Sequence, residues 1–183
     1  MLLKRSGPVL MACVVLALFV AGCAGTAGSA KPLTVAPKAE ILARYTKMRL
    51  ATSAQRDASK MTAADRERVA ALVAQKVKER AADRFTDFAA TTTDVETLHV
   101  TIVFTRYDEG SAFARFMLAG LGQIHIEAEV TLEDRALQTV IGKFDVTKTF
   151  AWGGIYGGAT GIKDVEDGFA EAVAKVVLGQ PSE

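Results

Sequence analysis

The stretch Ile124-His125-Ile126-Glu127-Ala128-Glu129-Val130-Thr131-Leu132-Glu133 decides the fold. Apolar and polar side chains alternate along it, which is the period of a strand with one buried face and one wet face. Segments 98–105 and 139–150 show the same alternation. Because a sheet with one wet face is typical of antiparallel pairing, the three segments predict an antiparallel sheet.

Two further segments have the period of an amphipathic helix. Residues 62–80 open with Thr62 and Asp65, the spacing of a capping box. Residues 162–178 are followed by Gly179 and Pro181, which end helices. The apolar residues at helical spacing are Val69, Leu72, Val73 and Val77 in the first segment and Ile162, Val165, Phe169, Val173 and Val176 in the second.

A less regular strand is expected near Tyr45 and Met48, which completes the order strand, helix, three strands, helix. Two amphipathic helices and one single-sided sheet bury each other most simply in two layers. The sequence therefore predicts an α+β, two-layer sandwich: a mostly antiparallel sheet of about four strands with two helices on one face. One domain over 41–183 accounts for all of these elements.

The amino end has the composition of an export signal. Lys4 and Arg5 precede an apolar run over 8–20, and small residues follow. The run holds about 13 residues, whereas a bilayer-spanning helix needs about 20. We therefore predict a signal peptide over 1–22, and a flexible tether over 23–40 that carries small residues and two prolines.

The segment Val20-Ala21-Gly22-Cys23 resembles the lipobox of bacterial lipoproteins. The resemblance implies that Cys23 carries acyl chains, palmitate among them, and holds the protein at a membrane. Ala24 is not the aspartate that retains enteric lipoproteins at the inner membrane, so the periplasmic face of the outer membrane is favoured. The competing interpretation is an ordinary secretory signal with a chance cysteine. Loss of Lys4 and Arg5 changes the formal charge from +1 to −1, and no basic face for nucleic acid is indicated.

Antiparallel strands reverse direction at each turn, so connections 106–123 and 151–161 are expected at the same end of the sheet. Both contain several glycines and exposed apolar or aromatic residues, which are typical of a surface that another molecule covers. The candidate interaction residues are Phe113, Arg115, Phe116, Gly120, Gly122, Trp152, Gly154, Tyr156, Gly157 and Gly158.

The run Gly110-Ser111-Ala112-Phe113-Ala114-Arg115, the later Gly120-Leu121-Gly122, the strand ending Leu132-Glu133-Asp134 and the glycines over 153–158 resemble bacterial lipoproteins catalogued as domain of unknown function 4410. The resemblance covers about 43–178 and implies no activity. Its matching positions are Arg115, Gly120, Gly122, Asp134, Gly154, Gly157 and Gly158. The chain departs from the pattern at Ala136-Leu137-Gln138, where similar proteins place threonine and glycine.

The residues indicate no catalytic site, metal or cofactor. The chain contains two histidines, His99 and His125, and no Gly-x-Ser-x-Gly pattern. A metal site between the histidines on the wet face is the weaker alternative to a solvated sheet surface. Two functions remain open. The first is an interaction or assembly module that docks on an envelope protein, on its own copies or on a membrane. The second is a periplasmic carrier of a small apolar or lipid ligand.

Overall fold

The computed structural model describes residues 27–81, 84–88, 96–118 and 120–181. Its strands form one sheet in the spatial order β1-β5-β4-β3-β2. Their bounds are β1 (Ser29–Pro32), β2 (Lys47–Ala54), β3 (Thr97–Asp108), β4 (Ile124–Asp134) and β5 (Thr139–Phe150). The three strands expected from the alternating pattern are confirmed as β3, β4 and β5.

The central strands β3, β4 and β5 pair antiparallel, as predicted. In β4, Ile124, Ile126, Ala128 and Val130 are fully buried beneath the helices, while His125, Glu127 and Glu129 lie on the other face. The period of two therefore follows from burial on one side only. Ile124 pairs with Phe150, so the start of β4 and the end of β5 lie together.

The sheet is mostly antiparallel, as predicted, but it has five strands where about four were expected. β2 runs parallel to β3, from Lys47 beside Thr97 to Ala54 beside Phe104. A parallel neighbour requires a crossover, which α3 provides. The additional strand is β1, which lies within the segment 23–40 predicted as tether. It pairs with β5 because Ala30 packs into the core and the backbone completes the ladder. The predicted signal peptide and Cys23 lie outside the described residues.

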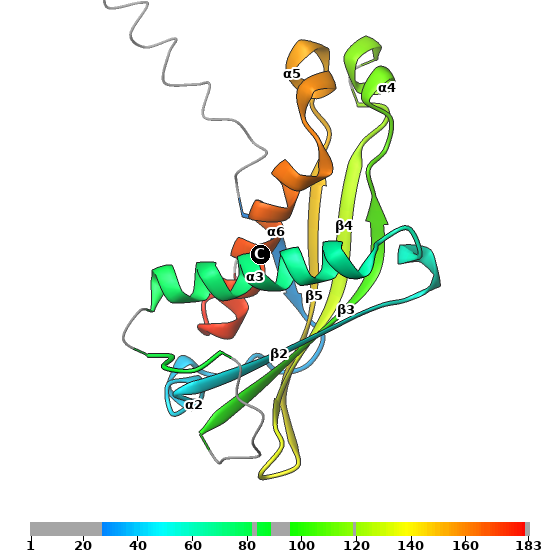
Figure 1. Ribbon diagram of the computed structural model, residues 1–183. Coiled ribbons are helices and arrows are strands. Elements are labelled where there is room, and N and C mark those ends of the chain that lie inside the picture. The colour runs from blue at the N-terminus through cyan, green and yellow to red at the C-terminus, as the bar shows by residue number, and fades with distance from the viewer. Residues whose placement is uncertain (1–26, 82–83, 89–95, 119, 182–183) are drawn as a thin grey trace, which may run out of the picture.

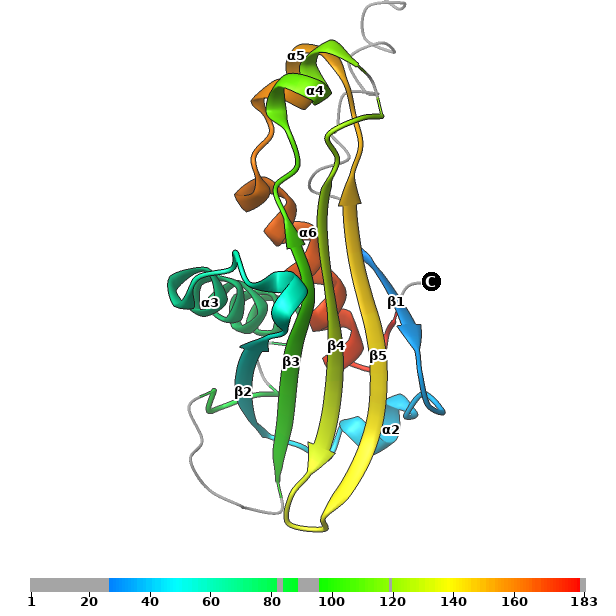
Figure 2. The same cartoon turned by 90° about the vertical axis from the view of Figure 1, so that its right-hand side faces the viewer.

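Two long helices, α3 (Ala63–Arg80) and α6 (Ile162–Val177), cover one face of the sheet, as predicted (Figures 1 and 2). The capping box of α3 is confirmed, because the Asp65 N–H donates to Thr62 Oγ1 at 3.1 Å and the Thr62 N–H donates to Asp65 Oδ2 at 2.9 Å. Hydrogen bonds from Thr62, helped by Arg68, lower the pKa of Asp65 to about 2. Within the described residues, no helix combines the length and apolar character needed to cross a bilayer.

The connections 106–123 and 151–161 lie at the same end of the sheet, as predicted, but they are not simple loops. They contain the short helices α4 (Ala112–Met117) and α5 (Gly154–Ala159), which lie side by side beyond the body of the domain (Figures 1 and 2). At the opposite end lie α2 (Ala39–Leu42) and the turn between β4 and β5. We call the described residues of 110–123 and 151–161 the tip.

A buried ionic cluster joins α3, α6 and β3. Glu166 on α6 is fully buried and accepts two hydrogen bonds from the Arg68 guanidinium, at 2.7 and 2.8 Å. The Tyr107 hydroxyl donates to the same carboxylate at 2.6 Å, and burial raises the pKa of this phenol. A buried carboxylate is tolerated when its acceptor positions are filled in this way. The cluster therefore fixes the two helices against each other and against the sheet.

The cluster can be tested with Glu166→Gln. Replacement removes the buried negative charge that accepts from both Arg68 and Tyr107 and leaves Arg68 with its contact to Asp65, so the free energy of unfolding should fall by about 2–4 kcal/mol. Asp167→Asn is the matched control on the adjacent residue, because Asp167 is half exposed and its ion pair with Lys76 lies at the surface. Its cost should be under about 1 kcal/mol. Urea unfolding followed by circular dichroism measures both, and equal costs would contradict a role for the buried cluster.

Candidate functional site

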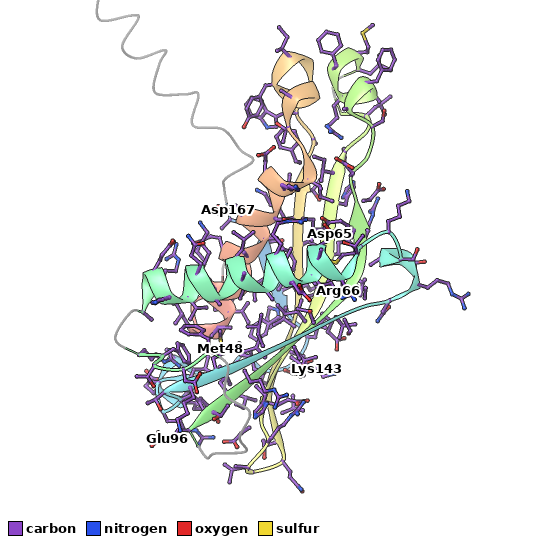
Figure 3. The ribbon with its side chains drawn as sticks, in the orientation of Figure 1. Met48, Asp65, Arg66, Glu96, Lys143 and Asp167 are labelled. Carbon is purple, nitrogen blue, oxygen red and sulfur yellow. The ribbon has the colours of Figure 1, made fainter. Side chains whose placement is uncertain are left out.

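The tip presents apolar side chains to solvent. Phe113 is 75 % exposed, Ile155 is 82 % exposed and Trp152 is 51 % exposed. Side chains project outward from both helices of the tip in Figure 3. The other large apolar side chains exposed on α4, α5 and their flanks are Phe116, Met117, Leu118, Leu121 and Tyr156. A group of large exposed apolar side chains of this kind is typical of a contact site.

The tip is also almost free of charge. Segments 110–123 and 151–161 contain one charged residue, Arg115. Arg115 is 1 % exposed, and its guanidinium points inward between α4 and α5. It donates to the backbone carbonyls of Gly157 at 2.9 Å, Glu109 at 2.8 Å, Gly122 at 2.6 Å and Thr160 at 2.9 Å. The rigid fork of an arginine suits this task, since it offers five N–H donors. Arg115 therefore joins the two halves of the tip and leaves their outer surface uncharged.

The glycines predicted as site residues shape the tip and do not offer side chains to a ligand. Gly122 has φ +68°, and a Cβ there would lie 2.4 Å from the Ser111 carbonyl oxygen. Gly157 packs so closely that its Cβ would lie 2.1 Å from the Trp152 carbonyl oxygen. The remaining predicted glycines serve turns or packing: Gly120 and Gly154 have positive φ, and Gly158 lies against Phe116.

Aromatic rings connect the tip to the sheet. Tyr156 contacts Phe150 and Trp152 edge to face, with ring centroids 5.8 and 6.1 Å apart. Tyr156 also lines an open pocket of about 620 Å³ with Leu72 and Lys163. Phe113 and Trp152 do not line this pocket, and both are at least half exposed. The arrangement is an outward patch, which favours docking over carriage of an enclosed ligand.

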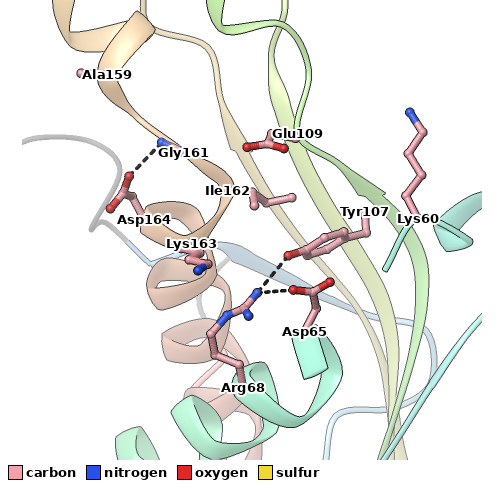
Figure 4. Close-up of a pocket in the computed structure, with 10 residues that line it drawn as sticks. All are labelled: Lys60, Asp65, Arg68, Tyr107, Glu109, Ala159, Gly161, Ile162, Lys163 and Asp164. Atoms are coloured by element: carbon pink, nitrogen blue, oxygen red, sulfur yellow. Dashed lines mark hydrogen bonds and ion pairs between the residues drawn. The ribbon is translucent and has the colours of Figure 1, made fainter. Parts of the chain in front are cut away.

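A second pocket, of about 560 Å³, lies where the tip joins the body, between the amino ends of α3 and α6 (Figure 4). Lys60, Lys163 and Arg68 face it together with three carboxylates, and both helix ends are capped by their own side chains, Asp65 and Asp164. Positive and negative groups balance there. The pocket therefore shows no preference for a charged ligand.

The histidines do not form a joint site. His99 is opposite Glu133 and His125 is opposite Asp108, at the two ends of the β3–β4 pairing. Nine residues of strand separate these positions, which is about 30 Å. His125 shares a hydrogen bond with Thr149 at 3.1 Å, and burial lowers the pKa of both imidazoles. The alternative of a metal between the two histidines is therefore wrong.

Asp134, identified only through the family resemblance, has a structural role far from the tip. It is 1 % exposed and accepts from the Tyr45 hydroxyl at 2.8 Å, from Arg44 at 3.0 Å and from the Leu137 N–H at 3.0 Å. Burial alone would raise the pKa of this carboxyl, but the hydrogen bonds and the Arg44 charge together hold it below its ordinary value. The Leu137 contact anchors the turn where the sequence departs from the family pattern.

Comparison with known proteins gives a family and a fold. The family model "Domain of unknown function (DUF4410)" matches residues 29–154, so the predicted resemblance to this domain family is confirmed, although the match begins and ends earlier than the expected 43–178. No curated protein matches the sequence. Two structures of the PelC dodecamer from Paraburkholderia phytofirmans, one of a point variant, have TM-scores of 0.54 and 0.53 at 15 % identity. Each comparison covers 85 % of this chain and 99 % of the PelC chain.

A crystal structure of a protein from Xanthomonas campestris, described by the family model DUF330, matches with a TM-score of 0.44 at 15 % identity. It covers 84 % of this chain and 88 % of that chain. At these identities the PelC structures show the fold alone.

The role of Arg115 is testable by Arg115→Lys. An ammonium has three donors on one atom and cannot reach four carbonyls on both halves of the tip. Amide hydrogen exchange over 112–117 and 154–159 should accelerate about tenfold or more, while the strands of the body stay protected. Arg106→Lys is the matched control, since Arg106 lies half-exposed on the sheet. Unchanged exchange at the tip in Arg115→Lys would show that the guanidinium does not hold it together.

Proposed function

This chain belongs to the DUF4410 family, and we propose that it is an acyl-anchored lipoprotein of the bacterial envelope, a non-catalytic assembly module whose tip contacts the bilayer that holds Cys23. The observation that carries this proposal is the uncharged apolar surface of the tip. Its location would be the periplasmic face of the outer membrane, which Ala24 favours.

The chemistry of the tip suits a lipid surface. Trp and Tyr side chains are preferred at the membrane–water interface, where an apolar ring meets lipid and a polar edge meets headgroups. Trp152 and Tyr156 lie together on one half of the tip, and Phe113 and Phe116 lie on the other. Charges are costly in hydrocarbon, and the one charge of the tip is turned inward. Several side chains of the tip can therefore enter the membrane interface without bringing a charged group with them.

The direction of β1 supports an orientation in which the tip faces the bilayer. Ser29 pairs with Thr147 and Pro32 with Phe144, so the amino end of β1 faces the tip (Figure 2). Cys23 precedes Gly28 by five residues, a span of at most about 17 Å. The end of β5 at Phe150 lies three residues beyond Thr147, or about 10 Å. An acylated Cys23 can therefore reach the level of the tip.

Self-association is the assembly that we propose. The PelC chains that share this fold form dodecamers. A set of anchored copies would present many tips to one membrane, and the contacts would reinforce one another even when each tip binds weakly. The outward direction of the aromatic side chains supports contact with an extended surface in preference to a small enclosed ligand.

Acylation of Cys23 is the first requirement. In cells fed labelled palmitate, the wild-type protein should take up the label and remain in the membrane fraction, because two or three acyl chains hold a protein stably. Cys23→Ser should lose the label and leave the membrane. Cys13→Ser is the matched control, since Cys13 lies in the predicted signal peptide. Label retained in Cys23→Ser would contradict the anchor.

The tip contact can be followed with Trp152, the one tryptophan of the chain. Vesicles with brominated acyl chains should quench its fluorescence in the full acylated protein, because bromine quenches only on close approach. Phe113→Ser with Ile155→Ser should reduce quenching at least twofold, since these are the most exposed apolar side chains of the tip. Leu137→Ser with Val140→Ser is the matched control at the opposite end. Quenching that is absent in the wild type would rule out lipid as the occupant of the tip.

A further inference from the structure

The amino-terminal strap, defined as Gly28–Pro37, decides how long the membrane tether is. At Gly28 the backbone N–H donates to the Gly168 carbonyl at 2.8 Å, and a Cβ would lie 2.4 Å from the Thr147 carbonyl oxygen. This close fit fixes the chain five residues after Cys23. While the strap is docked, five residues of chain separate Cys23 from Gly28, so the proposed anchor can reach at most about 17 Å from this point.

The strap is held mainly by hydrogen bonds and buries little apolar surface. In β1, Ala30 is fully buried, but Ser29 and Lys31 are exposed, and Pro32 has no N–H to donate. Besides the Gly28 bond, its contacts include the β5 ladder, the Leu33 N–H to the Lys143 carbonyl at 2.8 Å, the Lys143 N–H to Thr34 Oγ1 at 3.0 Å, and a bond between the Ser29 and Thr147 hydroxyls at 2.9 Å.

Beyond β1, the strap lies on the surface. Val35 is 91 % exposed, and Pro37 touches Gly142. A four-residue edge strand with one buried methyl group has little apolar burial to offset the entropy of ordering. Local release of the strap is therefore much easier than unfolding of the domain.

Release would lengthen the tether. The next element after the strap is α2, which begins at Ala39 and buries Leu42, so the free chain after Cys23 would grow from about five residues to about fifteen. Its contour length would rise from about 17 Å to about 50 Å. A longer flexible tether lowers the effective concentration of the tip at the bilayer. Release would also remove the burial of Ala30 and the hydrogen bond from the Gly28 N–H to the Gly168 carbonyl of α6.

We propose that the strap is a releasable length control for the membrane tether: docked on β5 it keeps the tip at the bilayer, and undocked it lets the domain move away. This inference rests on the proposed function, since the tip must contact the membrane for tether length to matter. Release of the strap from β5 is a conformational change that the uncharged surface of the tip does not itself imply.

The test uses the full acylated protein in vesicles with brominated lipids and reads Trp152 quenching. A Ser29→Cys, Thr147→Cys pair locks the strap, because these residues are directly opposite in an antiparallel ladder. Ala30→Asp undocks it by placing a charge in the core. Val35→Asp is the matched control, the same substitution at an exposed position of the strap. A variant with ten Gly/Ser residues inserted after residue 26 lengthens the tether without disturbing β1.

We expect quenching to be strongest in the oxidised lock, to return to the wild-type value when the lock is reduced, and to fall at least twofold in Ala30→Asp and in the insertion variant. Val35→Asp should match the wild type. In hydrogen exchange, the amides of β1 should exchange at least tenfold faster than those of β4, and the lock should slow them. Urea unfolding shows whether Ala30→Asp stays folded, and the insertion variant tests tether length if it does not.

The experiment distinguishes failure of the length control from failure of the membrane contact. Equal quenching in the wild type, the lock and the insertion variant would overturn the length control and leave the proposed membrane contact standing. Exchange of the β1 amides as slow as that of β4 would overturn it as well. Absence of quenching in every form, the oxidised lock included, would overturn the membrane contact and the strap proposal together.

Discussion

Antiparallel pairing of β4 with both of its neighbours brings Asp108, Ile124 and Phe150 to one end of the sheet. The two connections that leave this end have no helix of the body above them, so they must pack on each other. Their apolar side chains are then divided between a small shared interior and an outer surface. The site thus follows from strand register, and its exposed residues have no place in the main core.

The interior of the tip is unusual in being built around a cation. Short helices leave backbone carbonyls at their ends that need donors from outside the helix. The Arg115 guanidinium donates to four carbonyls at once, from both halves of the tip, and one of these, Gly122, also accepts from the Ser111 N–H. A hydrophobic side chain of similar volume would fill the space but leave buried carbonyls unpaired, which is costly. The backbone carbonyls that need hydrogen-bond donors therefore explain why Arg115 points inward. Because its charge is turned inward, the outer surface of the tip is uncharged.

The sequence predicted the features that repeat along the chain and missed those that depend on a single distant partner. The alternation of β3, β4 and β5 and the helical period of α3 and α6 come from burial on one face, which leaves a mark at every second or every third and fourth residue. β1 has one inward residue, Ala30, which makes no period, and the direction of β2 depends on a crossover. The contact of Glu166 with Arg68 joins residues 98 positions apart.

A partial signal for that contact was present. Glu166 lies within the apolar stripe of α6, between Val165 and Phe169, where an unpaired carboxylate would be too costly to bury. Its position indicates a partner without identifying one. At the tip, the exposed aromatic residues were predictable from their loops, but the inward direction of Arg115 was not, because it depends on carbonyls that both connections supply.

If Cys23 carries the proposed acyl chains, the backbone sets how far the tip can lie from the bilayer. The register of Ser29 with Thr147 fixes where the docked chain begins, and the length of β5 fixes where the tip begins. Each residue added between Cys23 and Gly28 moves the reachable position of the anchor by about 3.5 Å. The headgroup layer on each side of a bilayer is about 5–8 Å thick. The reach of two tether residues is therefore comparable to the thickness of the headgroup layer. Docking of β1 shortens the free tether by about ten residues, which changes the reach of the anchor more than any rearrangement of side chains at the tip can.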